Sequence, residues 1–80
     1  MKLTIQTFAV LKEHFHQKFE FESSAIETIE QLRTELSKMK PVAASILRSC
    51  RFALNDELVN DTTELYDNAA IYIIPPSSGG

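Results

Sequence analysis

The chain has 80 residues and a mass of 9.0 kDa, which suffices for one compact domain and is too short for two. Hydrophobic residues make up 44% and charged residues 24% of the chain, as in folded globular domains, and the net charge of −3 disfavours binding to nucleic-acid phosphates. The longest apolar run, residues 69–74, is too short to cross a membrane, and no signal core follows Met1 and Lys2, so we expect a cytoplasmic protein.

Alternation of apolar and polar residues predicts two strands near the N-terminus. Leu3 and Ile5 alternate with polar residues, which predicts a strand over residues 2–6. Phe19 and Phe21 alternate with charged residues and predict a second strand. The stretch from residue 10 to residue 15 is too short for an independent helix, so we expect a short helical turn between the strands.

An amphipathic helix is predicted in the middle of the chain. Ser24 and Glu27 have the spacing of a capping box, which predicts that the helix begins there. Pro41 disfavours helical geometry at Lys40 and should end the helix. The apolar stripe that would pack on a sheet contains Ile26, Ile29, Leu32, Leu36 and Met39.

A shorter helix and a hairpin are predicted next. Pro41 suits the first turn of a second helix over residues 42–48, because its missing N–H is not needed there. Residues 51–55 then alternate as a strand, Asn55-Asp56 has the residues typical of a turn, and residues 58–59 begin another extended piece.

The last predicted strand is the most apolar segment of the chain. A loop over residues 60–63 and a tight turn at Asp67-Asn68 precede the strand, which spans residues 70–74 and should lie centrally in the sheet. Pro75-Pro76 lacks backbone donors and should stop strand pairing. The order of elements predicts an α+β domain over residues 1–76, with a main helix on one face of a mixed sheet, and a short tail over 77–80.

Few residues in the sequence suggest chemistry of their own. His14 and His16 could supply two metal ligands, but no further His or Cys cluster would complete a coordination sphere, so solvated histidines are favoured and no metal site is predicted. Cys50 lacks an evident basic partner and is expected in the core. There is no glycine-rich phosphate loop, because the only two glycines are the last two residues.

The position of those two glycines is the most informative feature of the sequence. Average usage of about 7% would give five or six glycines, yet this chain makes all its turns without glycine and ends in Gly79-Gly80. A frayed end is one interpretation. The other is a tail that threads a narrow channel and presents its carboxyl to another protein, since side chains would clash there. Pro75-Pro76 would stiffen the base of such a tail.

The ending resembles the small, sulfur-carrying subunit of molybdopterin synthase, the MoaD-like family. Here residues 71–74 run into Pro75-Pro76-Ser77-Ser78-Gly79-Gly80, and residues 8–13 and 52–55 are similar to the first and third strand regions of that family. The chain departs from the pattern at Ser77, commonly aliphatic, and at residues 67–69, often an acidic turn with glycine. The resemblance implies a ubiquitin-like β-grasp fold, with four to five strands, one main helix and one or two short helices.

The resemblance also implies chemistry at the carboxyl of Gly80. A carboxylate is a poor electrophile, so a ubiquitin-activating-type adenylyltransferase would use ATP to form an acyl-adenylate, and a persulfide sulfur donor would convert it to a thiocarboxylate. The chain itself would hold no permanent cofactor. The residues that would thread the tail are Pro75, Pro76, Ser77, Ser78 and Gly79.

The implied acceptor is a second protein. The thiocarboxylate tail would enter the large subunit of molybdopterin synthase, within a heterotetramer, and pass sulfur to cyclic pyranopterin monophosphate to build the dithiolene of molybdopterin. Most catalytic side chains would belong to the large subunit. If Ile71 and Ile73 face the helix, Tyr72 and Ile74 face the opposite side. Ile74 matches a family position that packs on partners, so it is a candidate interface anchor, with ordinary core or edge packing as the alternative.

Three other functions stay open. The sulfur carrier of thiazole synthesis also ends in Gly-Gly on a β-grasp domain, although it is usually shorter and lacks the Pro-Pro-x-x-Gly-Gly ending. A ubiquitin-like modifier would use the same activated tail with lysine as its acceptor. A plain interaction domain would need no chemistry at Gly79-Gly80, so it should keep its function when those residues are deleted.

Overall fold

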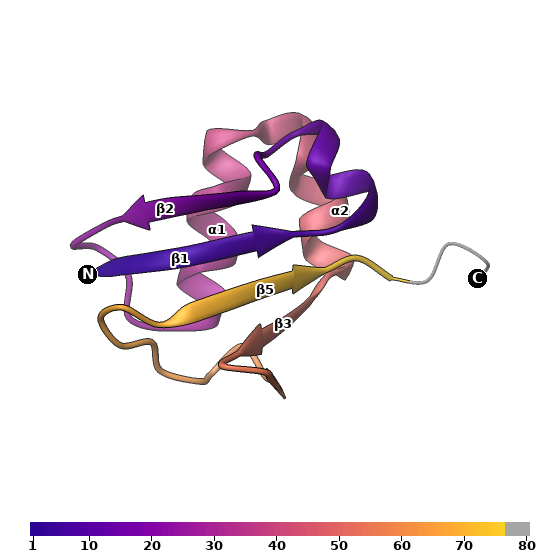
Figure 1. Cartoon of the computed structure of the whole chain (residues 1–80). Helices are drawn as coiled ribbons and strands as arrows, with labels where there is room; N and C mark the ends of the chain where they lie inside the picture. Colours follow the sequence, from indigo (N-terminus) through magenta and orange to yellow (C-terminus); the bar gives the residue numbers. More distant parts are fainter. Residues whose placement is uncertain (77–80) are drawn as a thin grey trace.

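The computed structural model describes residues 1–76, which form a mixed sheet with helices on one face (Figure 1). Within these residues the strand order is β2-β1-β5-β3-β4; β1 and β5 are parallel and the other pairs are antiparallel. No helix in this part of the chain has the length and apolarity needed to cross a membrane. The strands are β1 (Lys2–Thr7), β2 (Lys18–Glu22), β3 (Arg51–Leu54), β4 (Glu57–Val59) and β5 (Ala70–Ile74). The helices are the 3-10 turns η1 (Ala9–Glu13) and η2 (Pro41–Ala43) and the α-helices α1 (Ile29–Met39) and α2 (Ala44–Ser49).

The core lies between the sheet and helices α1 and α2. Each fully buried aliphatic side chain there contributes roughly 1.5–3 kcal/mol relative to exposure, so a small set accounts for much of the stability. Met39, which the sequence assigned to the apolar stripe of the helix, is 51% exposed at the end of α1. The largest fully buried hydrophobic side chains are Phe52, Leu3, Ile5, Leu11, Ile29, Leu32, Leu36, Leu47, Ile71 and Ile73.

Strand β5 occupies the centre of the sheet, as the sequence predicted. Its partners are β1, in parallel register from Thr4 opposite Ala70 onward, and β3, in antiparallel register with Arg51 opposite Ile74. The strand ends immediately before Pro75, which cannot donate to either neighbour.

The predicted turns form without glycine. Asn55 and Asp56 have φ angles of 49° and 73°, so both central residues of the β3–β4 hairpin are left-handed, as a type I′ turn requires. Asn68 has a φ of 67° in the turn before β5. Asparagine and aspartate tolerate this region better than other side chains do. Ala9 also has a positive φ, 53°, immediately after β1 and Phe8.

The predicted start of the main helix was wrong. The N-cap is Thr28, whose Oγ1 accepts from the backbone N–H of Gln31 at 3.3 Å, and the Gln31 side chain accepts in return from the Thr28 N–H at 3.2 Å. Thr28 is extended and pairs with Glu64, while the Glu27 carbonyl accepts from the Leu65 N–H. This long-range pairing holds the segment before Thr28 out of the helix, although Ser24 has the same local spacing.

The guanidinium of Arg33 joins α1 to three other segments. One terminal nitrogen donates to the carbonyl oxygens of Leu47 at 2.5 Å and Cys50 at 2.9 Å, at the end of α2. The other donates to Asp61 Oδ1 at 2.6 Å. The planar group also lies 4.6 Å from the ring centroid of Phe52, in β3. A cation suits this place because the carbonyls at a helix C-terminus carry partial negative charge.

The corrected N-cap can be tested with a pair of variants. Thr28→Ala removes the side-chain acceptor of the capping box and should lower the free energy of unfolding by about 1 kcal/mol. Ser24→Ala, the matched control at the position the sequence favoured, should change it by less than about 0.5 kcal/mol. Urea denaturation followed by far-UV circular dichroism measures both, and a larger loss for Ser24→Ala would contradict the assignment.

The contribution of Arg33 to stability depends on its planar guanidinium, which can donate to several acceptors at once. In Arg33→Lys a single ammonium keeps the charge but cannot reach the carbonyls of α2 and the Asp61 carboxylate together. We therefore expect the free energy of unfolding to fall by about 2 kcal/mol. The control is Arg48→Lys on the exposed side of α2. The free energy of unfolding of this variant should stay within about 0.5 kcal/mol of that of the parent. Equal losses in the two variants, measured by the same denaturation, would show that the planar guanidinium is unimportant.

Candidate functional site

The end of β5 is where the sequence places the candidate site. Ile74 is the last residue of the strand, and Pro75 and Pro76 follow it. The remaining candidate residues, Ser77, Ser78, Gly79 and Gly80, lie outside the residues that the structure describes. Because β5 is paired on both sides, the chain after Ile74 starts from the most constrained part of the sheet.

The predicted alternation along β5 is confirmed. Ile71 and Ile73 are fully buried against the helices, with 0% of their surface exposed. Tyr72 and Ile74 therefore lie on the opposite face of the sheet, which no helix covers, and both are half-buried there. The two side chains that the sequence proposed for an interface thus share the open face.

Neighbouring strands extend this apolar surface. Residues directly opposite one another in a sheet share a face, so Ala53 lies beside Tyr72 on one side and beside Leu58 on the other. The Phe8 ring meets the Tyr72 ring edge to face, with centroids 5.7 Å apart. Leu58 is a large hydrophobic side chain and is 56% exposed. We call this surface the sheet patch; its members are Phe8, Ala53, Leu58, Tyr72 and Ile74.

The rest of the open face is polar. On β1 and β2, the pairs Lys2–Glu22, Thr4–Glu20 and Gln6–Lys18 lie opposite each other. The Lys2 ammonium also lies 3.6 Å from a Glu20 carboxylate oxygen. The apolar surface thus extends from β5 over β3 and β4, with Phe8 at the end of β1 as its member on the other side, and Arg51 lies next to Ile74 at its margin.

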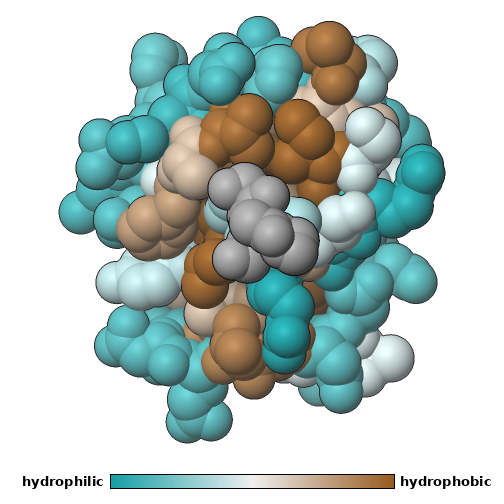
Figure 2. All heavy atoms as spheres, turned by 90° about the vertical axis from the view of Figure 1, so that its right-hand side faces the viewer, coloured by the Kyte–Doolittle hydropathy of each residue, from teal (hydrophilic) through white to brown (hydrophobic). Residues whose placement is uncertain are grey.

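The end of the molecule where β1 and β5 finish is also rich in apolar side chains. Figure 2 views this end directly and shows hydrophobic side chains around the point where the described chain stops. Val10, at the start of the connection after β1, is 39% exposed. A partner that approached this end would meet an apolar surface, which an isolated domain rarely leaves open without use.

Sequence reasoning did not assign Phe8 or Leu58 to the site. Phe8 follows the first strand and contacts Tyr72 across 64 positions of sequence, which no local pattern indicates. Leu58 could have been found, because a two-residue turn at Asn55-Asp56 places it opposite Ala53.

Cys50 is buried in the core, as the sequence predicted. Its Sγ–H donates to the carbonyl oxygen of Ile46 at 3.1 Å. Burial raises the pKa of the Cys50 thiol to about 11, although the charge of Arg33 acts in the opposite direction. A thiol with this pKa is protonated at neutral pH, so Cys50 is unsuited to act as a nucleophile.

His14 is half-buried and His16 is exposed, and both line a surface pocket at the η1–β2 connection. Among residues 1–76, no group of three or more His, Cys, Asp or Glu side chains is placed to hold a metal ion. The described part of the site therefore offers a binding surface beside the end of a central strand that is paired on both sides.

Comparisons with known proteins agree with this arrangement. The model of the ThiS family matches residues 5–80. A curated relative from Chlamydomonas reinhardtii, named molybdopterin synthase sulfur carrier subunit, is 40% identical over 53 residues, which is 64% of this chain and 64% of that relative.

Solved structures with a similar fold match this chain. One, a complex of subunits 1 and 2 of molybdopterin-converting factor from Helicobacter pylori 26695, contains a chain that is 27% identical, with a TM-score of 0.71 and full coverage of both chains. A ubiquitin from Caldiarchaeum subterraneum is 20% identical, with a TM-score of 0.65 and coverage of 100% of this chain and 98% of that one. The second likeness shows the fold alone and confirms the predicted ubiquitin-like β-grasp architecture.

Proposed function

The chain belongs to the ThiS family, and on this premise we propose that it is the sulfur-carrier subunit of molybdopterin synthase. The carboxyl of Gly80 is the group that carries sulfur. The proposal is supported by the relative named molybdopterin synthase sulfur carrier subunit and by the likeness to a chain of the molybdopterin-converting factor complex. The observation that carries it is the position of β5: the central strand, bordered by the sheet patch, leads through Pro75-Pro76 into the Gly79-Gly80 ending.

Sulfur loading begins with activation of the carboxylate by a partner. A carboxylate oxygen of Gly80 attacks the α-phosphorus of ATP, which is bound by a ubiquitin-activating-type adenylyltransferase, and pyrophosphate leaves. The terminal sulfur of a persulfide donor then attacks the acyl carbon, and AMP leaves. A donor thiol cleaves the resulting acyl disulfide, which leaves sulfur on Gly80 as a thiocarboxylate and forms a disulfide on the donor side.

Sulfur delivery takes place in a second partner. The thiocarboxylate of Gly80 enters the large subunit of molybdopterin synthase, and its sulfur attacks a carbon of cyclic pyranopterin monophosphate, from which an oxygen leaves. Water then cleaves the thioester that joins carrier and substrate, so the sulfur stays on the pterin and Gly80 returns as a carboxylate. Two such transfers supply both sulfur atoms of the dithiolene. Gly79 has no Cβ, so the channel around the reacting carbon can be narrow. The large subunit supplies most catalytic side chains, which is consistent with the protonated, buried state of Cys50.

The sheet patch is the proposed docking surface for both partners. Aromatic side chains in apolar surroundings are the usual anchors of protein interfaces, and Tyr72 with Phe8 forms such a cluster. Ile74 lies between this cluster and Pro75, so contacts at Ile74 fix the direction in which the tail enters a partner. Sequential use of one surface also prevents the activating enzyme and the large subunit from binding the same carrier together.

Ile74→Asp tests this surface. Ile74 is half-buried on the open face and lies opposite Arg51, so the new carboxylate has a cationic neighbour and the fold should be retained. We expect the affinity for the large subunit and for the activating enzyme to fall at least about tenfold, as measured by isothermal titration calorimetry, because an anchor is replaced by a desolvated charge.

The matched control is Val42→Asp, which makes the same kind of change at a side chain that is 74% exposed in η2, away from the sheet patch. This variant should bind both partners like the parent. Unfolding of Ile74→Asp in a circular dichroism spectrum, or an unchanged affinity, would remove Ile74 from the interface.

The sulfur-carrier function is tested by mass spectrometry. Incubation with ATP, the activating enzyme and a persulfide donor should replace one oxygen of the Gly80 carboxyl by sulfur, a gain of about 16 Da. Top-down fragmentation must assign the gain to the last fragment, because oxidation of Met1 or of the exposed Met39 adds nearly the same mass. The control is a chain that lacks Gly79-Gly80, which should gain nothing.

The same experiment separates this function from its alternatives. An unmodified Gly80 under these conditions would support a plain interaction domain. A thiocarboxylate that transfers sulfur to the thiazole-forming enzyme, and not to cyclic pyranopterin monophosphate in the large subunit, would assign the carrier to thiazole synthesis. An amide bond between Gly80 and a lysine would indicate a modifier.

A further inference from the structure

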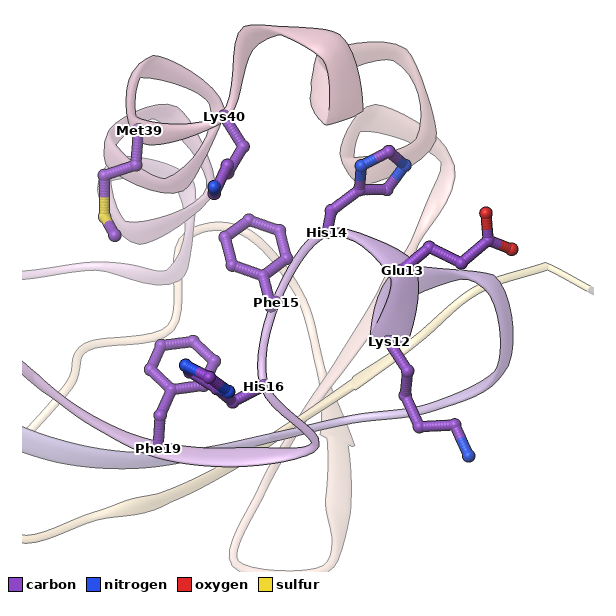
Figure 3. A pocket seen from close by; sticks show the side chains of 8 residues that line it. All are labelled: Lys12, Glu13, His14, Phe15, His16, Phe19, Met39 and Lys40. Atoms are coloured by element: carbon purple, nitrogen blue, oxygen red, sulfur yellow. The ribbon is translucent and has the colours of Figure 1, made fainter.

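A second surface feature lies on the helix side of the sheet. The η1–β2 connection and the end of α1 enclose a pocket of about 370 Å³. Figure 3 shows Phe15 in its middle, Met39 and Lys40 on the α1 side, and Phe19 with His16 on the β2 side. The Phe15 and Phe19 rings are stacked, with centroids 5.9 Å apart and an interplanar angle of 9°, and they form an apolar floor.

The wall formed by the η1–β2 connection is held in place by buried hydrogen bonds. Thr7 is fully buried, and its hydroxyl donates to the carbonyl of His16 at 3.0 Å while its N–H donates to the carbonyl of Gln17 at 2.8 Å. The Phe15 N–H donates to the Leu11 carbonyl at 3.0 Å. A pocket with a fixed wall loses little entropy when a ligand binds.

The charge around the pocket is opposite to that of the whole chain. Lys40 extends over the apolar floor beside Phe15, and the imidazole of His16 lies against Phe19, whereas the Glu13 carboxylate points away from them (Figure 3). The chain as a whole carries eight basic and eleven acidic side chains. With the histidines counted as neutral, as in the net charge of the chain, the pocket lining carries two cations, Lys12 and Lys40, and one anion, Glu13.

The pocket also adjoins a free strand edge. Strand β2 is the last strand of the sheet on its side, so alternate residues direct backbone N–H and C=O groups outward, with no further strand in the described chain to pair with them. An extended peptide can form hydrogen bonds with such an edge while its side chains enter a neighbouring pocket. A small molecule could use only the pocket.

From these observations we propose that the pocket formed by Phe15, His16, Phe19, Met39 and Lys40 binds an acidic peptide segment of another protein. Apolar side chains of the segment pack on the stacked phenylalanine rings, and its carboxylates face Lys40 and His16. Phe19 lies opposite Ile5, on the helix side of the sheet, so this site is separate from the sheet patch. A protein bound here can stay attached while another partner occupies the sheet patch, and the inference does not depend on sulfur transfer.

The test uses the ¹⁵N-labelled full chain and an acetylated peptide in which adjacent leucines are flanked by aspartates. Saturable amide shifts should appear at Phe15, His16, Phe19 and Lys40 and be absent at Tyr72 and Ile74. Two probe controls are the same peptide with lysines in place of the aspartates and the same peptide with serines in place of the leucines. Both should bind at least about tenfold more weakly, because each lacks one of the two required interactions.

A matched pair of variants tests whether Lys40 supplies the positive charge that binds the aspartates of the peptide. Lys40→Gln should lower the affinity for the aspartate peptide about fivefold, as expected for the loss of one partly exposed ion pair. Lys38→Gln removes a cation from the same helix end without touching the pocket and should change the affinity less than about twofold.

Several outcomes would overturn the proposal. These are no saturable shift with the aspartate peptide, equal losses in Lys40→Gln and Lys38→Gln, equal binding of the lysine peptide, or shifts centred on the sheet patch. Inorganic phosphate is titrated in parallel. If phosphate alone reproduced the shifts at the same concentrations, the site would bind small anions and the peptide assignment would be wrong.

Discussion

Contacts of the Arg33 guanidinium determine how the two halves of the domain fit together. This group reaches from α1 to the last carbonyls of α2, to the ring of Phe52 in β3 and to the Asp61 carboxylate in the loop before β5. Each of these segments follows α1 in the chain, so one side chain links the helix to three segments of the second half. The position of β3 in turn fixes which residues lie beside β5 on the open face. The sheet patch therefore depends on a contact made on the opposite side of the sheet.

The sheet patch and the ending of the chain are linked by the central strand. Parallel pairing with β1 places Phe8 next to Tyr72, and antiparallel pairing with β3 places Arg51 beside Ile74. Both neighbours hold β5 from opposite sides, which gives the residue before Pro75 a fixed position. The sheet patch and the start of the Gly79-Gly80 ending thus meet at β5. Under the proposed function, a partner that binds the patch would find the ending of the chain at a fixed place beside it.

The sequence predicted those features that local patterns encode. The strands at Lys18–Glu22 and Ala70–Ile74 follow from alternation and from apolar content, and the hairpin follows from Asn55-Asp56, because turn chemistry and strand period act over a few residues. The opposite faces of Tyr72 and Ile73 follow from the same period. The start of α1 could not be decided locally, since Ser24 and Thr28 both have capping-box spacing. Pairing of residues 27–30 with the distant segment 61–65 decided it.

Features that arise from packing between distant segments were not predicted. Phe8 joins the sheet patch only because β1 and β5 are neighbours, and the pocket beside β2 exists only because the end of α1 lies over Phe15. Neither contact has a signature in one sequence. The role of Gly80 rests on the resemblance of the ending to a family and not on any pattern of periodicity or charge.

The burial of Cys50 also affects the chemical selectivity of a carrier that handles reactive sulfur. With its pKa raised to about 11 by burial, the Cys50 thiol stays protonated at neutral pH. Persulfides and acyl-adenylates react with thiolates, so a more acidic or exposed cysteine would compete for the sulfur and for the activated acyl group, and could cross-link two carriers through a disulfide. The core that stabilises the fold thereby also keeps this thiol protonated, so under the proposed function Cys50 would not compete with Gly80 for sulfur.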